Sequence, residues 1–181
     1  MSHLTVYNDD QPAQAIIATD DVTRISEELA IAGIRFERWH AAHDLPDGAD
    51  NETILAAYRE EIDRLVAERG YQTFDVVSMH PEHPDKEAFR SKFLDEHTHG
   101  EDEVRFFVRG QGLFVIHVND RVYSILCGKD DLISVPANTR HWFDMGPNPS
   151  FTAIRLFNNP EGWVAQFTGD RIAGRFPLLE N

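Results

Sequence analysis

The chain has 181 residues, 41% of them hydrophobic and 27% charged, which is typical of one soluble globular domain that can bury a core. Its 31 acidic and 17 basic side chains give a formal net charge of −14 at pH 7. Such an acidic surface repels phosphate backbones and anionic lipids, so we expect neither a nucleic-acid partner nor a membrane partner.

Two further features predict a cytoplasmic protein. Cys127 is the single cysteine, so we expect a buried small hydrophobe and no intrachain disulfide, as is usual in a reducing compartment. The first ten residues lack the basic start and apolar run of a signal peptide, and no apolar stretch approaches the roughly 20 residues that span a bilayer.

The first half of the chain predicts helices and isolated strands. Helix caps, helical spacing of apolar residues and period-two alternation mark the elements. In chain order these are a strand over 4–7, a helix between the caps at 19–21 and Gly33, a strand over 34–39, a helix from Asp50 or Asn51 to Gly70, a strand over 74–79 and a short helix over 84–93.

From about residue 103 the sequence consists of closely spaced short strands separated by glycine, asparagine and aspartate turns. The predicted strands cover 104–108, 112–118, 121–126, 131–135, 141–143 and 152–157. We therefore predict an α+β chain dominated by an antiparallel sandwich or barrel. No sharp change in composition divides it, so we expect a single domain.

One segment carries a metal-binding pattern. His97 and His99 lie two residues apart, so an extended chain projects both from one face, and Glu103 and Arg105 share that parity if the chain stays extended. Two imidazoles and a carboxylate on one wall chelate a divalent metal, and antiparallel strands can bring His141 opposite them. We predict one mononuclear site formed by His97, His99, Glu103 and His141.

Arg105 has two interpretations. It is either an exposed strand residue in a surface ion pair worth about 0 to 1 kcal/mol, or a residue that points into the metal cavity and pairs with an anionic ligand. Its parity with Glu103 favours the second.

The other histidines fit the metal pattern less well. His80 and His83 flank a proline in acidic surroundings, which favours a solvated loop. The strand position of His117 favours a hydrogen-bonded core residue, and His40 and His43 have no matching partner nearby.

The pattern resembles a known family. The run from His97 to Gly110 resembles the first cupin motif, and Pro136-x-Asn138-x-x-His141 resembles the second, with asparagine where that motif usually has glycine. Asparagine also tolerates the left-handed backbone region. Over roughly residues 75 to 160 the chain is similar to the bacterial acireductone dioxygenases, through Phe93-Leu94-Asp95-Glu96-His97-Thr98-His99, Glu103-Val104-Arg105, Asp131-Leu132-Ile133-Ser134-Val135-Pro136 and His141-Trp142-Phe143-Asp144.

The resemblance implies a fold and a reaction. The fold is a double-stranded β-helix, the cupin or jelly-roll barrel, with a few peripheral helices: residues 1–75 pack on the barrel, 76–160 form its metal-binding core and 161–181 form a C-terminal segment. The four ligands would hold one Fe(II) or Ni(II) per chain. The protein would be a monomer. It would cleave 1,2-dihydroxy-3-keto-5-methylthiopentene with O₂ in methionine salvage, and Arg105 would stabilise the enolate oxygens of this substrate. The iron form would release 4-methylthio-2-oxobutanoate and formate, and the nickel form 3-methylthiopropionate, formate and carbon monoxide.

The methylthio tail of this implied substrate requires an apolar pocket. Phe93, Phe143 and Trp163 are the candidates, although ordinary core aromatics fit the pattern equally well. Glu96 and Asp102 are candidates for carboxylates that orient the histidines or act as a base.

Two other functions use the same ligands. One is a different metal-dependent cupin enzyme, such as another dioxygenase or an isomerase. The other is a non-catalytic, ligand-binding cupin, such as a ligand sensor. A sensor usually carries a DNA-binding domain, and the chain offers no basic recognition helix.

Overall fold

A computed structural model describes residues 1–39, 45, 46 and 48–181, so His40 and His43 lie outside the described residues. Strands dominate and a few helices lie around them, which confirms the predicted α+β class. The elements in order are β1 (His3–Asn8), β2 (Ala15–Thr19), α1 (Val22–Ile31), β3 (Arg35–Arg38), α2 (Asn51–Ala57), α3 (Arg59–Arg69), β4 (Thr73–Met79), α4 (Lys86–Leu94), β5 (His97–Thr98), β6 (Glu103–Val118), β7 (Arg121–Gly128), β8 (Asp131–Val135), β9 (Arg140–Asp144), β10 (Phe151–Phe157), the 3₁₀-helix η1 (Pro160–Trp163), β11 (Gln166–Phe167) and the 3₁₀-helix η2 (Ile172–Arg175).

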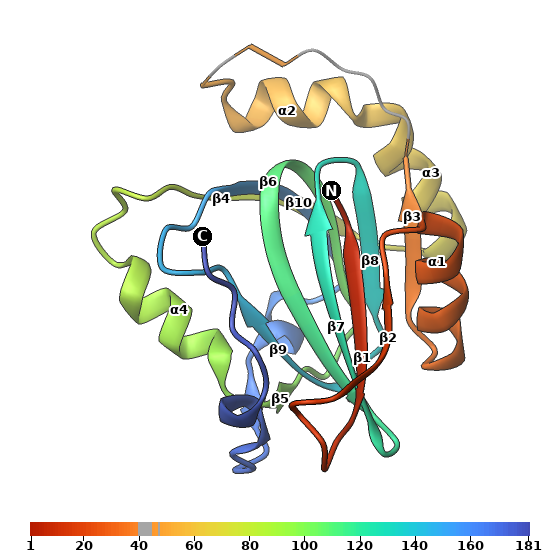
Figure 1. The fold of residues 1–181 in the computed structure, drawn as a ribbon. Coiled ribbons are helices and arrows are strands. Elements are labelled where there is room, and N and C mark those ends of the chain that lie inside the picture. The colour runs from red at the N-terminus through yellow and green to blue at the C-terminus, as the bar shows by residue number, and fades with distance from the viewer. Residues whose placement is uncertain (40–44, 47) are drawn as a thin grey trace.

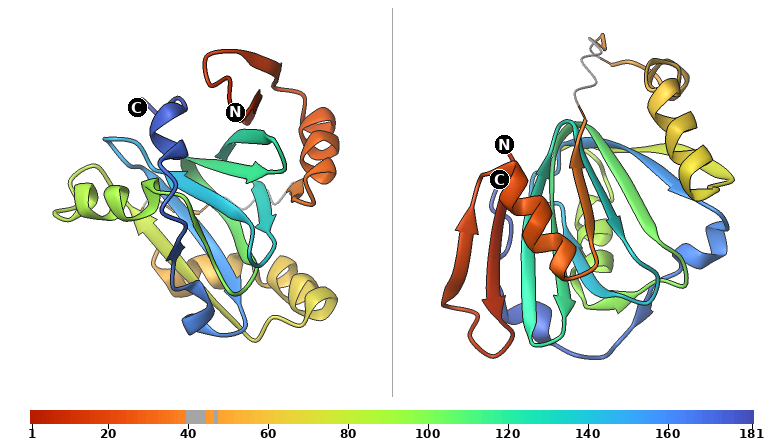
Figure 2. Two further views of the ribbon diagram at one scale, coloured as in Figure 1. Left: turned by 90° about the horizontal axis from the view of Figure 1, so that it is seen from below. Right: turned by 90° about the vertical axis from the view of Figure 1, so that its right-hand side faces the viewer.

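Two antiparallel sheets share the long strand β6 and wrap into a barrel (Figure 1). One sheet has the order β2-β1-β7-β6-β9-β5-β11, and the other has the order β4-β10-β6-β8-β3. The first part of β6 pairs with β8 and β10, while its second part pairs with β7 and β9. The helices lie outside the barrel (Figure 2).

Strand β6 corrects the prediction of two separate strands over 104–108 and 112–118. The strand continues without a break through Gly110, where φ is +67° and a side chain would clash with the Ser150 carbonyl oxygen. At Gly112 a Cβ atom would lie 2.5 Å from the Phe143 ring. The glycines therefore make a bend, not an end, and β6 can belong to both sheets.

Three hydrophobic clusters stabilise the barrel. Phe107, Phe114 and Phe143 belong to the interior cluster. A second cluster packs α2 and α3 on the outer face of the β4–β10–β6 sheet, and a third packs η2 and Phe176 against Trp142 on the other sheet. Cys127 is buried as predicted, and burial raises the pKa of its thiol far above the usual range.

The predicted helix from Asp50 to Gly70 is two helices. Tyr58 interrupts it with φ of −104° and ψ of 19°. Its ring is fully buried and packs edge-on against Phe106 at 5.1 Å, so tertiary packing overrides the helical spacing. The predicted caps hold: Asp50 accepts from the Thr53 amide, and Gly70 ends α3 in the left-handed conformation. None of the described helices is long and apolar enough to cross a membrane.

Candidate metal centre

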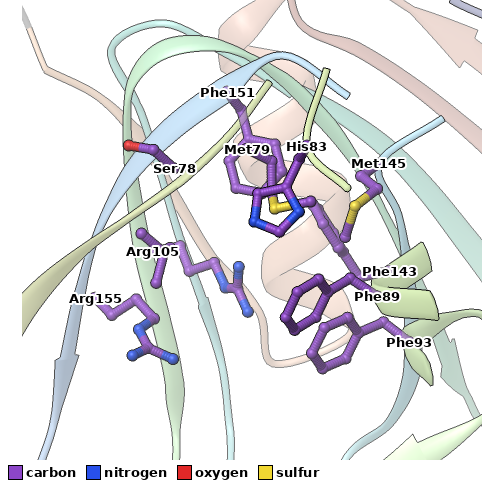
Figure 3. Close-up of a pocket in the computed structure, with 11 residues that line it drawn as sticks. Ser78, Met79, His83, Phe89, Phe93, Arg105, Phe143, Met145, Phe151 and Arg155 are labelled. Atoms are coloured by element: carbon purple, nitrogen blue, oxygen red, sulfur yellow. The ribbon is translucent and has the colours of Figure 1, made fainter. Parts of the chain in front are cut away.

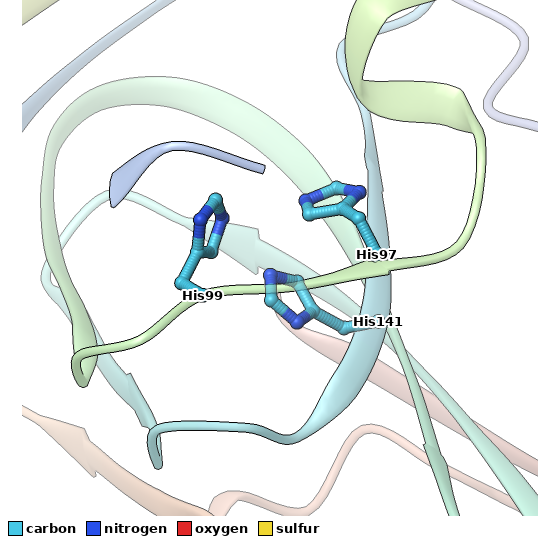
Figure 4. A group of neighbouring side chains, drawn as sticks. All are labelled: His97, His99 and His141. Atoms are coloured by element: carbon cyan, nitrogen blue, oxygen red, sulfur yellow. The ribbon is translucent and has the colours of Figure 1, made fainter. Parts of the chain in front are cut away.

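Three buried histidines meet at one end of the barrel. His97 lies on β5 opposite His141 on β9, and His99 follows His97 by two residues. One ring nitrogen from each of the three lies within 4.8 Å of those of the other two, and the rings face one another (Figure 4). The predicted His-x-His parity and the approach of His141 across antiparallel strands both appear in the structure.

Main-chain carbonyls fix two of the rings. His97 Nδ1 lies 2.7 Å from the Asp95 carbonyl oxygen, and His141 Nδ1 lies 2.8 Å from the Thr139 carbonyl oxygen. A carbonyl oxygen only accepts, so Nδ1 carries the proton and a neutral ring presents its lone pair at Nε2. Burial, reinforced by the neighbouring His141, lowers the pKa of His97 to about 4, so this ring is neutral at physiological pH.

Glu103 completes the cluster at the start of β6. Its Oε2 lies 2.9 Å from His141 Nε2 and 3.2 Å from His99 Nε2. Burial opposes ionisation, yet Arg105 and the two histidines hold the pKa of Glu103 well below its usual range. Because the Thr139 carbonyl oxygen accepts from His141 Nδ1, a neutral ring would direct its Nε2 lone pair at the carboxylate oxygen, and a cation between these two acceptors would make the contact favourable. This donor set fits a divalent metal.

Arg105 lies beside the carboxylate, as the strand parity predicts. Its Nε donates to Glu103 Oε1 at 2.8 Å, and the residue is buried. The guanidinium lies 5.2 Å from the centre of the Phe143 ring and 5.6 Å from that of Trp163. The arrangement places a fixed positive charge next to the histidine cluster, in an otherwise acidic protein.

Two cavities adjoin Arg105. The first, which we call the apolar cavity, has a volume of about 260 Å³ and is lined mainly by aromatic and methionine side chains, with Arg105 and Arg155 on one side (Figure 3). The second, the histidine cavity, has a volume of about 420 Å³. Phe93 lines both, Phe143 lines the apolar cavity and Trp163 lines the histidine cavity together with His99.

Several other residues that line the apolar cavity carry no recognisable signal in the sequence. Met79, His83, Phe89 and Met145 come from β4, the following loop, α4 and the position directly after β9. Nothing in their spacing marks a pocket, because only the tertiary fold brings these segments together. His83 is therefore partly buried at the cavity, while His80 is exposed as predicted.

Glu96 and Asp102 do not orient the three histidines. The Glu96 carboxylate accepts from His117 and Thr168, and Asp102 accepts from the Ala137 amide at 2.9 Å. Main-chain carbonyls perform the orienting role at His97 and His141, and the Nδ1 of His99 has no hydrogen-bond partner among the described residues. The expectation for these two carboxylates is corrected in this respect.

Asp102 instead holds the turn between β8 and β9. The Asn138 amide also donates to the His99 carbonyl oxygen at 2.8 Å, and Asn138 has φ of +63°. The asparagine at this position thus takes the left-handed conformation that glycine usually supplies. These bonds attach the turn before His141 to the loop that follows His99.

His117 is the hydrogen-bonded core residue that the sequence predicts. Its Nδ1 lies 2.7 Å from Glu96 Oε2 and its Nε2 lies 3.3 Å from Asp9 Oδ2. Two carboxylates require two N–H donors, so the ring is protonated in this arrangement. The hydrogen bond to Glu96, against an opposing effect of burial, raises the pKa of His117 above its usual value.

His117→Gln is expected to lower the free energy of unfolding by about 2 kcal/mol below pH 6.5, the loss of a hydrogen bond between charged groups. A raised folded-state pKa stabilises the native protein fully below the unfolded pKa, and this stabilisation is lost as pH rises through the folded pKa. The difference between wild type and variant should therefore shrink in alkaline urea titrations. A difference that is constant from pH 6 to 9 would contradict the charged contact.

Comparison with known proteins gives the family. The sequence matches the ARD/ARD′ family over residues 3–165. It is 61% identical to the acireductone dioxygenase of Pseudomonas aeruginosa over 100% of both chains. It is 57% identical to that of Yersinia enterocolitica over 99% of this chain and 100% of the relative. A solved structure of an acireductone dioxygenase from Bacillus anthracis superposes on this chain with a TM-score of 0.80 at 30% identity. The superposition covers 92% of this chain and 98% of the other, which holds a cadmium ion in its active centre. The chain belongs to the ARD/ARD′ family.

Proposed function

We propose that this chain is an acireductone dioxygenase with one metal site, formed by His97, His99, His141 and Glu103. The observation that carries the proposal is the meeting of three buried histidines with Glu103, beside the fixed charge of Arg105. The family relatives, at 57–61% identity over nearly their whole length, are named for this activity.

The metal proposed is Fe(II) or Ni(II), one per chain. Neutral imidazoles and a carboxylate suit both ions, and availability decides between metals whose ligand preferences overlap. When bound, the ion supplies the Lewis acidity that holds an enediolate ionised and brings it together with dioxygen.

The residues of the chain perform the remaining tasks. Arg105 offers its guanidinium to the enolate oxygens, in a buried place where a fixed charge acts more strongly than in water. Glu103 holds that guanidinium through Oε1, so the charge is oriented before the substrate arrives.

The substrate proposed is 1,2-dihydroxy-3-keto-5-methylthiopentene, cleaved with O₂ in methionine salvage. The iron form would give formate and 4-methylthio-2-oxobutanoate, and the nickel form formate, carbon monoxide and 3-methylthiopropionate. Both product sets contain all the atoms of the substrate and one O₂. The monomeric state and the cytoplasmic location stay predictions.

The apolar cavity is the proposed site for the methylthio tail. Met79→Trp should fill this cavity and lower kcat/KM for the full substrate by about 10- to 100-fold, since one or two apolar groups in a pocket are worth about 1 to 3 kcal/mol. A shortened acireductone that lacks the thioether should lose less than threefold. The measurement is steady-state kinetics with both substrates. Equal losses for both would place the tail elsewhere.

A substrate panel tests the activity itself. Iron-loaded protein, mixed with the acireductone under air, should consume oxygen and release formate above the metal-free control. Other enediols and thiols should react far more slowly. Faster turnover of one of those would indicate a different dioxygenase, and no oxygen uptake with any of them would indicate a binding protein.

A further inference from the structure

The loop between His99 and Glu103 contacts a second segment near the metal centre. Glu101 Oε2 accepts from the main-chain amides of Asn158 and Asn159, at 3.2 and 2.9 Å. These two residues directly follow β10 and precede η1. A carboxylate that receives two amide donors makes strong, charge-assisted hydrogen bonds. Glu101 therefore ties the beginning of η1 to the loop between two proposed ligands.

The 3₁₀-helix η1 carries Trp163 to the metal centre. Asn159 Oδ1 caps the helix by accepting from the Glu161 amide at 3.0 Å. The Trp163 ring lies nearly parallel to the His99 ring, 27° between planes and 6.2 Å between centres, and its centre is 5.0 Å from the Arg155 guanidinium carbon. Trp163 thus covers His99 and forms a wall of the histidine cavity.

The segment around Trp163 has few other polar attachments. Beyond it, β11 pairs with β5 and the Thr168 amide donates to the Glu96 carbonyl oxygen. The buried indole Nε1 of Trp163 has no hydrogen-bond partner among the described residues, and Val164 is 65% exposed. The ring position therefore depends on stacking and on the attachments at the two ends of the segment, of which Glu101 provides the first.

We propose that Glu101 is a positioning residue that holds Trp163 over His99 and Arg105, so that the histidine cavity is preformed for substrate. The proposal rests on the proposed function, because it assigns a role at the same site. Without Glu101 the segment keeps its attachment at β11 but loses the one at Asn158 and Asn159. Trp163 then spends most of its time away from His99.

Glu101→Ala should raise KM for the acireductone by about tenfold with kcat changed less than threefold. The apparent affinity for substrate falls in proportion to the fraction of molecules in which Trp163 lies over His99. Metal content should stay at the wild-type value. Glu101→Gln keeps an amide oxygen that accepts both N–H groups, so it should restore KM to within about threefold of wild type. Glu161→Ala is the matched control, since it removes an exposed glutamate from η1 itself.

A second measurement does not need turnover. Protein labelled with 5-fluorotryptophan should give resonances for Trp39, Trp142 and Trp163, and Trp163→Phe assigns the third. Glu101→Ala should move the Trp163 resonance toward the solvent position and leave those of Trp39 and Trp142, which are buried, unchanged.

The outcomes separate the two proposals. An unmoved Trp163 resonance in Glu101→Ala, an effect of Glu101→Gln as large as that of alanine, or loss of metal from the alanine variant would each overturn the positioning role. Wild-type protein that turns over no acireductone would overturn the proposed function, while the fluorine measurement still decides the contact between Glu101 and the Trp163 segment.

Discussion

His99→Ala is expected to lose stoichiometric metal binding and, with it, all measurable oxygen uptake. The side chain supplies one of the three clustered nitrogens, and its Nε2 lies 3.2 Å from Glu103 Oε2. Its removal takes one imidazole away from buried Glu103 and leaves the proposed metal with three ligands. Elemental analysis after gel filtration in a metal-free buffer measures the loss.

His80→Ala serves as the matched control, because that histidine is exposed and lies outside the cluster. It should retain one metal per chain. Full metal retention by His99→Ala would remove this residue from the proposed ligand set.

Arg105→Lys is expected to lower kcat/KM by about 10²- to 10³-fold, the usual effect of removing one donor that stabilises a developing oxyanion. Lysine keeps the positive charge beside buried Glu103, so folding and metal content should survive. It lacks the planar fork that can donate to Glu103 Oε1 and to a substrate oxygen together. Steady-state kinetics on metal-matched samples measures the effect.

Arg59→Lys changes an exposed arginine on α3 in the same way and should leave kcat/KM unchanged. Two results would count against the proposed role. A kcat/KM for Arg105→Lys within threefold of wild type would show that the guanidinium fork is dispensable. Loss of the metal would show that Arg105 acts by holding Glu103.

Period-two parity predicted much of the site correctly. It placed Glu103 and Arg105 on one face of a strand, and the two side chains share a hydrogen bond there. Antiparallel pairing brought His141 opposite His97. These predictions succeeded because side-chain direction in a strand is a local property of the backbone.

Other predictions, which depended on particular long-range neighbours, failed. Gly110 signalled the end of a strand, but the neighbouring Ser150 explains why glycine is required within a continuous one. Glu96 was a candidate for orienting the metal-site histidines, whereas its carboxylate contacts His117, which is 21 residues away. The strands β2 and β11 are too weakly patterned to be recognised, and the apolar cavity exists only where β4 and the loop after it, α4, β6, β9 and β10 come together.

Glu101 illustrates the same limit. In the sequence it is one of two acidic residues between His99 and Glu103, and nothing marks it as different from Asp102. In the structure each has its own partner: Asp102 holds the β8–β9 turn and Glu101 holds the segment before η1. The acidic run between the proposed ligands thus connects two separate walls of the site to the metal-binding loop.

The central claim is that one site in this chain cleaves an acireductone and that its metal decides the products. The most direct test splits one metal-free preparation, loads the halves with Fe(II) or Ni(II) to one ion per chain, and identifies the products formed under air. Both halves should consume oxygen and release formate, and the nickel half alone should release carbon monoxide. Identical products from the two halves would contradict control by the metal, and no formate from either would contradict the assigned reaction.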